Sequence, residues 1–356
     1  MRPSSPRLLA VLCVLGTSAP SAPTAFGADE WSTPFAGIRY LHRTTDNPKF
    51  DIHLVFADLT EPGVRFVVSS PAEDKATVSR FAKKRGLQIA TNGDFNTERG
   101  GSIPRGLTIS GGKTWPEGED DPQNTTIAYG AGGRMEYFPG PLVVKPEAWM
   151  TDVIGGHPDM IVNGQPVENM KADALMNARH PRTATGLSKD RKTLMLLVVD
   201  GRQKHSIGMT GKDMTALFQE FGAWWAVNQD GGGSSAIYLE GQGILNKPSD
   251  GRERPVVNYQ GIAAPKGAGH AKGQVKGYVK ADGKPVAGAK VALSSAYFDV
   301  TTAEGYFHLS QVPAGSASLS VTADGFAPEK ASVKVEANTA AETTVELSAK
   351  GDAATK

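Results

Sequence analysis

A run of three glycines enclosed by two apolar segments constrains the fold of this chain more than any other feature. Residues 228–235 read NQDGGGSS and lie between the apolar runs 223–227 (AWWAV) and 236–239 (AIYL). Both runs have the length and composition of buried strands. Because glycine loses more backbone entropy on ordering than any other residue, three in succession indicate a loop that needs positive φ or close approach by a ligand. An ordinary tight turn is the alternative.

The first 27 residues have the pattern of a secretory signal. Arg2 and Arg7 precede a short apolar run at 8–15, and small residues at 25–27 offer a cleavage site. Cys13, the single cysteine of the chain, lies in this run, so we expect a mature protein without thiols. Export without disulfides is compatible with a bacterial envelope, and we expect a periplasmic or extracellular location.

The charge balance argues against nucleic acid as a partner. Loss of Arg2 and Arg7 leaves 36 of the 38 basic residues against 37 acidic ones, a net charge of −1. The sequence shows no basic stripe and no later apolar run of membrane-spanning length. We therefore expect no nucleic-acid partner, and no transmembrane anchor once the signal is removed.

The remaining chain divides into two parts by its pattern. Strand-like segments with a few helices, mostly without βαβ alternation, occupy 28–265 and predict an α+β fold with a mixed sheet. A small, glycine-rich linker is expected at 266–272. Short alternating strands with turns every ~8–12 residues fill 273–349 and predict a small β-sandwich. We expect 350–356 to be a disordered tail.

Several local elements are well marked in the first part. The apolar run 194–202 predicts a central strand covered on both faces. A capping box at 210–213 predicts the start of a helix, and Asn-Gly at 163–164 predicts a tight hairpin turn. Turn residues in the middle of 51–70 favour a hairpin between the two strand-like halves of that segment.

Polar residues gather at the ends of the predicted strands. The clusters are Asn92 with Asp94, Arg182 with Thr183, Asp200 with Arg202, and the segment 246–254. Strand ends that border loops are where sites are usually built on rigid scaffolds. Taken singly, each cluster is more often an ordinary turn or a solvated loop than a site.

Together the clusters resemble the phosphodiester glycosidase family over roughly 77–264. The motifs that carry the resemblance, in order, are 92–95 (NGDF), 182–186 (RTATG), 200–201 (DG), 208–214, 228–235 and 247–254. The segments 273–293 and 301–328 resemble carboxypeptidase regulatory-like, transthyretin-like domains, which are usually non-catalytic. The resemblance therefore implies a catalytic part followed by a small transthyretin-like β-sandwich.

The resemblance implies an exported hydrolase that breaks the bond between an anomeric carbon and a phosphate oxygen. Its substrate would be a sugar-1-phosphodiester of the N-acetylglucosamine-1-phosphodiester type, within a phosphorylated glycan or cell-wall polymer. Two alternatives remain open. One is a phosphodiesterase that cleaves the same substrate on the phosphorus side, and the other is a non-catalytic envelope protein that binds phosphorylated glycans.

Four residues are the candidates for catalysis: Asp230, Asp200, Arg182 and Asn92. Asp230 is the first candidate for a carboxylate near an oxocarbenium-like centre, and Asp200 is the second. Arg182 would hold the diester anion through its planar guanidinium. Asn92 would hydrogen-bond to sugar hydroxyls or to the carboxylates.

The glycine loop is expected to supply most of the substrate contacts, because consecutive free amides can form a concavity that binds anions. Arg254 is a second-choice cation for the same anion, and Trp115, in a polar loop, is a candidate for stacking on a sugar. The expected binding residues are Asn228, Gly231, Gly232, Gly233, Ser234, Ser235, Asp94 and Arg254.

No cofactor is expected from the motifs. No HxH or HExxH spacing links the seven histidines to zinc, and the Gly-Lys pairs lack the spacing of a nucleotide phosphate loop. The alternative is a hard cation such as Ca²⁺, held through oxygen atoms by Asp94, Asp200 and Asp230.

Overall fold

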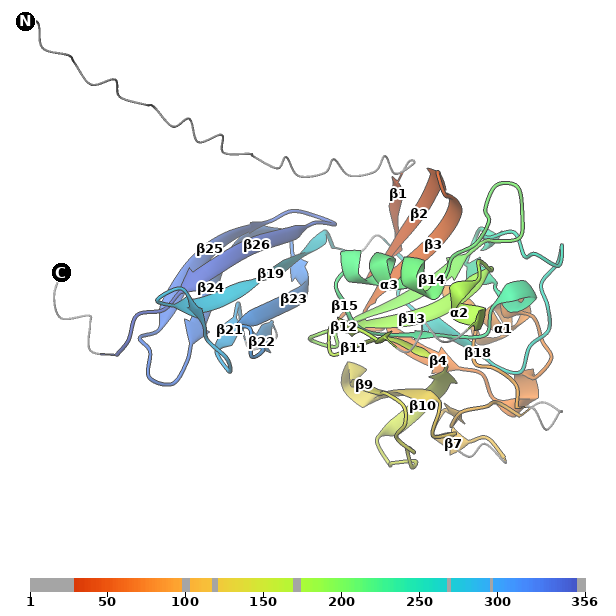
Figure 1. The fold of residues 1–356 in the computed structure, drawn as a ribbon. Coiled ribbons are helices and arrows are strands. Elements are labelled where there is room, and N and C mark those ends of the chain that lie inside the picture. Colours follow the sequence, from red (N-terminus) through yellow and green to blue (C-terminus); the bar gives the residue numbers. More distant parts are fainter. Residues whose placement is uncertain are drawn as a thin grey trace, which may run out of the picture.

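The computed structural model describes residues 29–97, 103–116, 121–168, 174–267, 270–294 and 297–350. The predicted signal at 1–27 and all but the first residue of the predicted tail at 350–356 lie outside these ranges. The described chain is mostly strand, with few helices, as the sequence predicts (Figure 1). The α-helices are α1 (Val78–Arg85), α2 (Ala174–Asn177) and α3 (Gly211–Glu220). No helix among the described residues is both long and apolar enough to span a bilayer.

An eight-stranded sheet forms the centre of the first part. Its strands, in spatial order, are β1 (Asp29–Phe35), β2 (Ile38–Asp46), β3 (Lys49–Asp58), β14 (Thr193–Val199), β13 (Arg182–Ser188), β15 (Ala223–Asn228), β11 (Asp159–Val162) and β12 (Gln165–Pro166). β14 is buried along its whole length, which confirms the predicted central strand. Alternate side chains of a strand point to opposite faces, so both faces of the sheet must be covered here.

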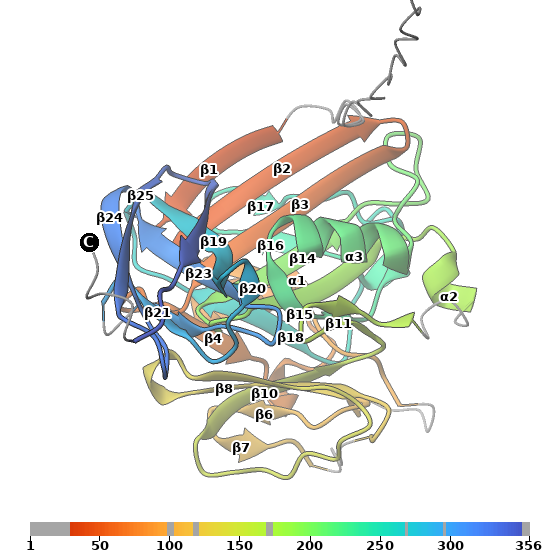
Figure 2. The ribbon, with the colours of Figure 1, turned by 60° about the vertical axis from the view of Figure 1, so that its left-hand side comes forward.

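Two smaller sheets pack around the central one. The first consists of β17 (Gly243–Ile244), β16 (Ile237–Leu239), β5 (Ile89–Asn92), β18 (Tyr259–Ala263) and β4 (Arg65–Val68). The second consists of β7 (Lys113–Thr114), β6 (Ile109–Ser110), β10 (Met150–Gly156), β8 (Thr125–Gly130) and β9 (Met135–Phe138). Figure 2 shows β6, β7, β8 and β10 as a separate layer below the large sheet.

The main core lies between the three sheets. On β14, Leu194, Leu196 and Val198 enter this core, where they meet side chains of the two smaller sheets such as Ile89 and Ile154. The alternate residues of β14 face the opposite side, where α3 covers them with the apolar residues Met214, Leu217 and Phe218. The helix α1 covers the outer face of the sheet that contains β5 in the same way. Burial on both faces thus explains why the sequence of β14 is continuously apolar.

The strand pairing differs from the mixed sheet that the sequence suggests. Every pairing between the described strands of 29–263 is antiparallel, since successive strands are joined without βαβ crossovers. The hairpin predicted within 51–70 is also wrong. Its first half, β3, pairs with β2 and β14, whereas its second half, β4, pairs with β18 in another sheet. The turn residues between the two halves therefore lie where the chain crosses from the large sheet to the sheet that contains β4.

Other local predictions are confirmed. Thr210 accepts a hydrogen bond from the amide of Asp213, and the Asp213 side chain accepts one from the Thr210 amide, so the capping box starts α3 as predicted. Asn163 and Gly164 have φ of 53° and 78° and join β11 to β12. These positive values are what a two-residue hairpin turn requires.

The C-terminal part is a sandwich of two four-stranded sheets. One contains β20 (Lys284–Pro285), β19 (Lys272–Ala281), β23 (Tyr306–Pro313) and β26 (Ala340–Glu346). The other contains β22 (Phe298–Val300), β21 (Lys290–Ala292), β24 (Gly315–Thr322) and β25 (Glu329–Val335). Apolar side chains from both sheets share one core, in which Phe307 faces Leu319. The predicted β-sandwich is therefore confirmed, and β19 begins at the last residue of the expected linker.

Buried polar contacts join the two parts. The ammonium group of Lys272 lies against the carboxylate of Asp58 and 3.1 Å from that of Glu61. Lys189 makes a 2.6 Å ion pair with Asp299. The indole of Trp224 also stacks on the ring of Tyr306, with centroids 6.0 Å apart. These contacts hold the C-terminal sandwich beside the first part of the chain, as Figure 1 shows.

We predict that Lys272→Met destabilises the protein by about 3 kcal/mol, because removing one partner of a buried ion pair leaves the other charge uncompensated. The charge left behind is that of Asp58, whose side chain is 1 % exposed. Urea unfolding measures the change, and Lys284→Met, at an exposed position, is the control. Adding Asp58→Asn to Lys272→Met should restore part of the loss. Equal stability of the Lys272 and Lys284 variants would contradict the prediction.

Candidate active site

The strand register brings the predicted motifs to one edge of the large sheet. In the pairing of β13 with β14, Arg182 lies opposite Val199, and in that of β13 with β15, Ala184 lies opposite Asn228. Because the neighbours are antiparallel, the beginning of β13 meets the ends of β14 and β15. This edge lies beside α2, on the side of the molecule away from the C-terminal sandwich (Figures 1 and 2).

A small cavity of about 110 Å³ opens at this edge. Asp230 is the acidic residue among the described residues that line it, and the glycine loop forms part of its wall. The described residues that line it are Phe95, Leu175, His180, Arg182, Arg202, Asn228, Gln229, Asp230, Gly231 and Gly232.

The glycines allow two guanidinium groups to approach the loop backbone. Gly232 has a φ of 64°, and a Cβ atom at this position would lie 3.2 Å from both terminal nitrogens of Arg202. A Cβ atom on Gly233 would overlap the guanidinium of Arg254. Only glycine meets both requirements, a left-handed backbone and a close cation, without strain. The loop is therefore more than an ordinary turn.

Part of the predicted anion cradle is already engaged within the protein. The loop folds into a single 3₁₀ turn (Gly232–Ser234). The amide of Gly232 donates to the carbonyl of Pro181 at 2.9 Å, and that of Ser234 donates to the carbonyl of Gly231 at 3.2 Å. Because these N–H groups already have acceptors inside the protein, positive charge near the cavity comes from arginine side chains instead.

Asp230 lines the cavity, and two hydrogen bonds hold its backbone. Its amide donates to the carbonyl of Gly93 at 3.1 Å, and its carbonyl accepts from the side-chain amide of Asn92 at 2.5 Å. Burial raises the pKa of the Asp230 carboxyl, against the lowering effects of the Ser234 hydroxyl, the Arg254 charge and the Gly231 amide. The structure thus keeps a buried carboxylate near the positive charge of Arg254.

Arg202 and His180 complete the polar lining. The side chain of Arg202 is exposed, and its Nη2 lies 3.3 Å from Nδ1 of His180. Burial and the charges of Arg182 and Arg202 lower the pKa of His180. The imidazole is therefore neutral near pH 7. The sequence placed Arg202 in a strand-end cluster, but it gave no signal for a role of Arg202 or of His180.

Arg182 lines the cavity, but its guanidinium is tied to backbone carbonyls of the protein, which the sequence-based expectation did not foresee. The guanidinium donates to the backbone carbonyls of Met209 at 3.0 Å, Leu175 at 2.6 Å and Ala178 at 2.8 Å. The side chain is 2 % exposed. With its donors directed at carbonyls, Arg182 ties α2 and the segment before α3 to β13, and it is a positioning residue.

Asn92 and Asp94 are likewise committed to the protein itself. The side-chain carbonyl of Asn92 accepts from the Thr183 hydroxyl at 2.8 Å and from the Ala236 amide at 3.2 Å. The Asp94 carboxylate accepts from the backbone amides of Phe95 and Gly106. Burial raises the pKa of Asp94 to about 7 against these hydrogen bonds. Both residues position loops around the cavity, and neither faces it.

Asp200 lies outside the cavity as well. Its carboxylate accepts from the Lys247 amide at 3.0 Å, from Asn246 at 3.1 Å and from His205 at 2.9 Å. Burial is the main influence on the Asp200 carboxyl and raises its pKa. Asp94, Asp200 and Asp230 therefore have separate sets of partners, and the described residues do not form the Ca²⁺ cluster that the sequence suggested.

Asn228 keeps one polar atom available at the cavity. Its side-chain nitrogen donates to the carbonyl of His157 at 2.7 Å, whereas its buried Oδ1 has no hydrogen-bond partner among the described residues. The hydroxyl of Ser235 is also buried and unpartnered within the described structure. Because an unpaired buried acceptor is costly, Oδ1 of Asn228 is suited to receive a hydrogen bond from a ligand.

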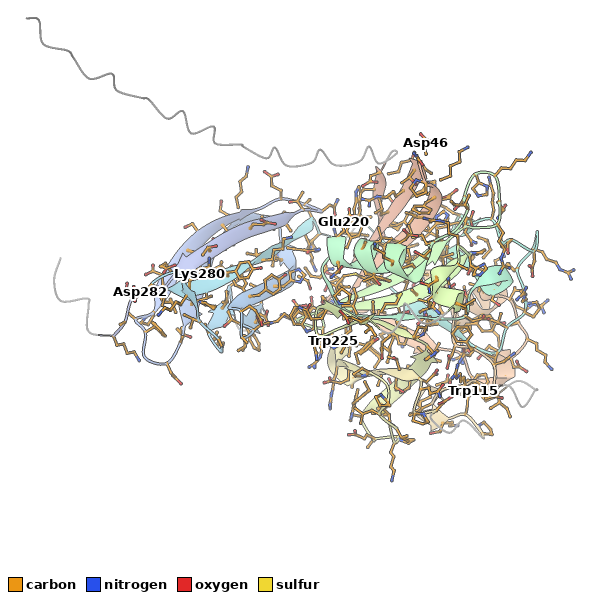
Figure 3. All side chains as sticks on the ribbon, in the orientation of Figure 1. Asp46, Trp115, Glu220, Trp225, Lys280 and Asp282 are labelled. Carbon is orange, nitrogen blue, oxygen red and sulfur yellow. The ribbon has the colours of Figure 1, made fainter. Side chains whose placement is uncertain are left out.

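The tryptophans do not provide the expected sugar platform. Trp115 is 4 % exposed, and its indole nitrogen donates to the carbonyl of Ser69 at 2.8 Å, so it belongs to the core. Trp225 packs in the main core, nearer the C-terminal strands than Trp115 (Figure 3). The aromatic residue at the cavity is instead Phe95, which directly follows Asp94 in the first motif.

The chain is similar to known proteins in both parts. The family model described as phosphodiester glycosidase matches residues 85–263, and that of the carboxypeptidase regulatory-like domain matches residues 274–348. The SPβ prophage-derived uncharacterized protein YomE of Bacillus subtilis (strain 168) is 46% identical over 90 residues, which span 25% of this chain and 14% of that protein.

Solved structures resemble the fold. The catalytic domain of zebrafish N-acetylglucosamine-1-phosphodiester alpha-N-acetylglucosaminidase, auto-inhibited by its pro-peptide, superimposes with a TM-score of 0.51 at 21% identity. The match covers 68% of this chain and 89% of that one. A hypothetical protein from Synechocystis matches with a TM-score of 0.46 at 17% identity, covering 64% of this chain and 62% of that one.

The buried guanidinium of Arg182 leads to a prediction about stability. Arg182→Met should lower the free energy of unfolding by at least about 2 kcal/mol, because each buried carbonyl that loses its donor costs ~1–3 kcal/mol. Arg182→Lys should recover only part of this loss, since one ammonium group cannot reproduce the planar fork. Thermal or urea unfolding measures the effect, with Arg252→Met at an exposed position as the control. A stable but inactive Arg182→Met protein would restore the catalytic interpretation.

Proposed function

Since the chain belongs to the phosphodiester glycosidase family, we propose that its cavity hydrolyses a sugar-1-phosphodiester of the N-acetylglucosamine-1-phosphodiester type. One observation carries the proposal: Asp230 and Arg202 line the same small cavity, and the charge of Arg254 acts on the Asp230 carboxylate. The reaction needs a carboxylate near a positively charged anomeric centre and a cation at the phosphate. These groups match both needs.

The proposed reaction breaks the bond between C1 of the sugar and the phosphate oxygen. The bonding electrons leave with the phosphate, which becomes a phosphomonoester, and a water oxygen forms the new bond to C1. Arg202 holds the phosphate as its charge increases. Asp230 stabilises the oxocarbenium-like centre and accepts the proton released by the attacking water, either directly or through the neutral His180. Oδ1 of Asn228 accepts a hydrogen bond from a sugar hydroxyl.

The size of the cavity supports binding of the reacting centre alone. Pockets that enclose a whole ligand usually measure ~300–1,000 Å³, whereas this one measures about 110 Å³. The anomeric carbon and its phosphate would occupy the cavity, and the rest of the glycan would extend over the rim, where Leu175 is 47 % exposed. A polymeric or branched substrate fits this arrangement.

The other parts of the chain suggest where the enzyme acts. Every lining residue of the cavity lies before residue 265, so we infer that 28–265 carry the activity. The C-terminal sandwich would serve as a non-catalytic, transthyretin-like module that spaces the enzyme from a surface or contacts glycan. With the signal pattern at 1–27, this organisation supports export to the cell envelope or the medium.

The role of Asp230 is tested by comparing Asp230→Asn with Asp200→Asn. Both substitutions remove a negative charge and retain the size of the side chain. Asp230→Asn should lower kcat/KM for a methyl N-acetylglucosamine-1-phosphate diester by at least about 100-fold with little change in Tm. Asp200→Asn should instead lower Tm, because its carboxylate holds Lys247, Asn246 and His205. An active, well-folded Asp230→Asn protein would remove Asp230 from the mechanism.

The position of cleavage separates the two enzymatic alternatives. In ¹⁸O-labelled water, cleavage at C1 places the label in the released sugar, whereas cleavage at phosphorus places it in the phosphate. We expect the label in the sugar. Stoichiometric binding of the diester without turnover by the wild-type protein would favour the non-catalytic, glycan-binding alternative.

The fall of kcat/KM at acidic pH should depend on Ser234. Asp230 must be ionised to act, and its pKa is raised by burial but lowered by the Ser234 hydroxyl. Activity should therefore fall on acidification at a higher pH than for an ordinary aspartate. Ser234→Ala removes the lowering hydrogen bond and should move this fall to still higher pH. The dependence of kcat/KM on pH measures the effect, with the exposed Ser318→Ala as control. An unmoved fall would assign it to another group.

A further inference from the structure

A cluster of histidine and aspartate side chains lies on the strands β2 and β3, outside the cavity. His42 is directly opposite His53 in the antiparallel pairing of these strands. Asp51 precedes His53 by two residues, so its side chain points to the same face of β3. The three side chains therefore meet on one face although 11 residues separate the two histidines. Sequence spacing did not reveal this arrangement.

The three groups are close enough to share one ion. The Nε2 atom of His42 lies 2.8 Å from Oδ1 of Asp51, and Nε2 of His53 lies 3.4 Å from the same oxygen. One ligand atom from each residue lies within 4.8 Å of the other two. The rings of His42 and His53 stack with an angle of 2° between their planes, which presents both Nε2 atoms toward Asp51.

One ring nitrogen of His53, Nε2, is buried without a hydrogen-bond partner among the described residues, which points to a ligand. The side chain of His53 is 4 % exposed, and its Nδ1 lies 2.7 Å from the Tyr40 hydroxyl. If Nδ1 carries the proton, it donates to Tyr40, and a bare lone pair on Nε2 faces a carboxylate. Burial opposes a second proton on the ring. A metal cation between Nε2 and Asp51 would satisfy both atoms.

The Tyr40 hydroxyl is hydrogen-bonded to the ring nitrogen of His53 that would not bind the metal. A metal-binding histidine almost always donates its second ring N–H to an acceptor, which fixes the tautomer and the ring orientation. The Tyr40 hydroxyl is such an acceptor for His53. The side chain of His42 is 30 % exposed, so an ion has a route to the cluster from solvent.

A second group adjoins the first through Asp51. The other carboxylate oxygen of Asp51, Oδ2, lies 3.8 Å from Nε2 of His205. The same Nε2 atom is 2.9 Å from the carboxylate of Asp200. The backbone joins the same segments, because the amide of Asp200 donates to the carbonyl of Asp51 at 3.0 Å. Any ion held at Asp51 is thereby linked to Asp200, which holds Lys247 and stands two residues before Arg202.

We propose that His42, Asp51 and His53 bind one Zn²⁺ ion through Nε2, Oδ1 and Nε2, with a fourth position open to water or to His205. Two imidazoles and one carboxylate are a ligand set that zinc accepts. Ca²⁺ and Mg²⁺ prefer oxygen ligands alone and fit it poorly. The ion would fasten the β2–β3 hairpin to the segment that leads to the cavity. This proposal does not depend on the proposed glycosidase activity.

The test measures metal binding directly on the purified protein without a histidine tag. After treatment with a chelator, calorimetric titration with ZnCl₂ should show one site, and added Zn²⁺ should raise Tm, because a ligand that binds only the folded state stabilises it. Co²⁺ should give visible absorption bands of low-coordinate, nitrogen- and oxygen-ligated cobalt. CaCl₂ and MgCl₂ should produce neither the heat nor the Tm shift.

Matched variants locate the ion. His42→Gln, at a partly exposed position, should keep the fold by circular dichroism while the affinity for Zn²⁺ falls at least about tenfold and the Tm shift disappears. His270→Gln, at an exposed position far along the chain, should behave like the wild type. The proposal is overturned if the wild type binds no stoichiometric Zn²⁺, if His42→Gln binds it equally well, or if His270→Gln alone loses it.

Discussion

The antiparallel register of β13, β14 and β15 is the constraint on which the rest of the molecule depends. Arg182 opposite Val199 and Ala184 opposite Asn228 set where three loops begin and end. A shift by one residue would exchange the two faces of each strand and move Leu196 out of the main core. The burial of both faces of β14 therefore fixes the register, and the register fixes the location of the cavity.

The polar residues at this edge divide by what they contact. Arg182, Asn92, Asp94 and Asp200 direct their side chains at backbone groups or at other side chains of the protein. They hold the loops at their positions. Asp230, Arg202 and Asn228 line the cavity, and Oδ1 of Asn228 has no hydrogen-bond partner among the described residues. A site of this kind is organised before substrate binds, which lowers the cost of orienting charged groups during reaction.

Beneath the glycine loop lies a buried amide network. The side-chain oxygen of Gln229 accepts from Thr185 at 2.9 Å and from Gln260 at 2.5 Å, and its nitrogen donates to the carbonyl of Gly155 at 3.1 Å. These contacts join β13, β18 and β10, which belong to three different sheets. Buried polar groups that are paired with each other specify one arrangement of neighbouring elements. Hydrogen bonds of Gln229 thus anchor the loop that contains Asp230, and the guanidinium groups of Arg202 and Arg254 lie against Gly232 and Gly233.

Residue order alone was enough to predict most local elements and the family. The continuous apolar run of β14, the capping box at Thr210, the Asn163-Gly164 turn and the alternation of the C-terminal strands all depend on neighbours in the chain, so residue order reveals them. The polar motifs were also recognisable, because their residue types and order are properties of the chain. Asp230 was the first candidate for the carboxylate on that basis, and it stands in the cavity.

The partners of each polar side chain follow from the three-dimensional packing and not from residue order. Arg182 has carbonyls within reach because α2 folds over β13, whereas Arg202 lies on the open side of the same edge. The segment 51–70 reads as one hairpin, yet burial of both halves in different sheets separated β3 from β4. His42 and Asp51 met across a strand pair that no spacing rule describes. Hydrogen bonds and burial depend on distances in space, and the order of residues along the chain does not contain those distances.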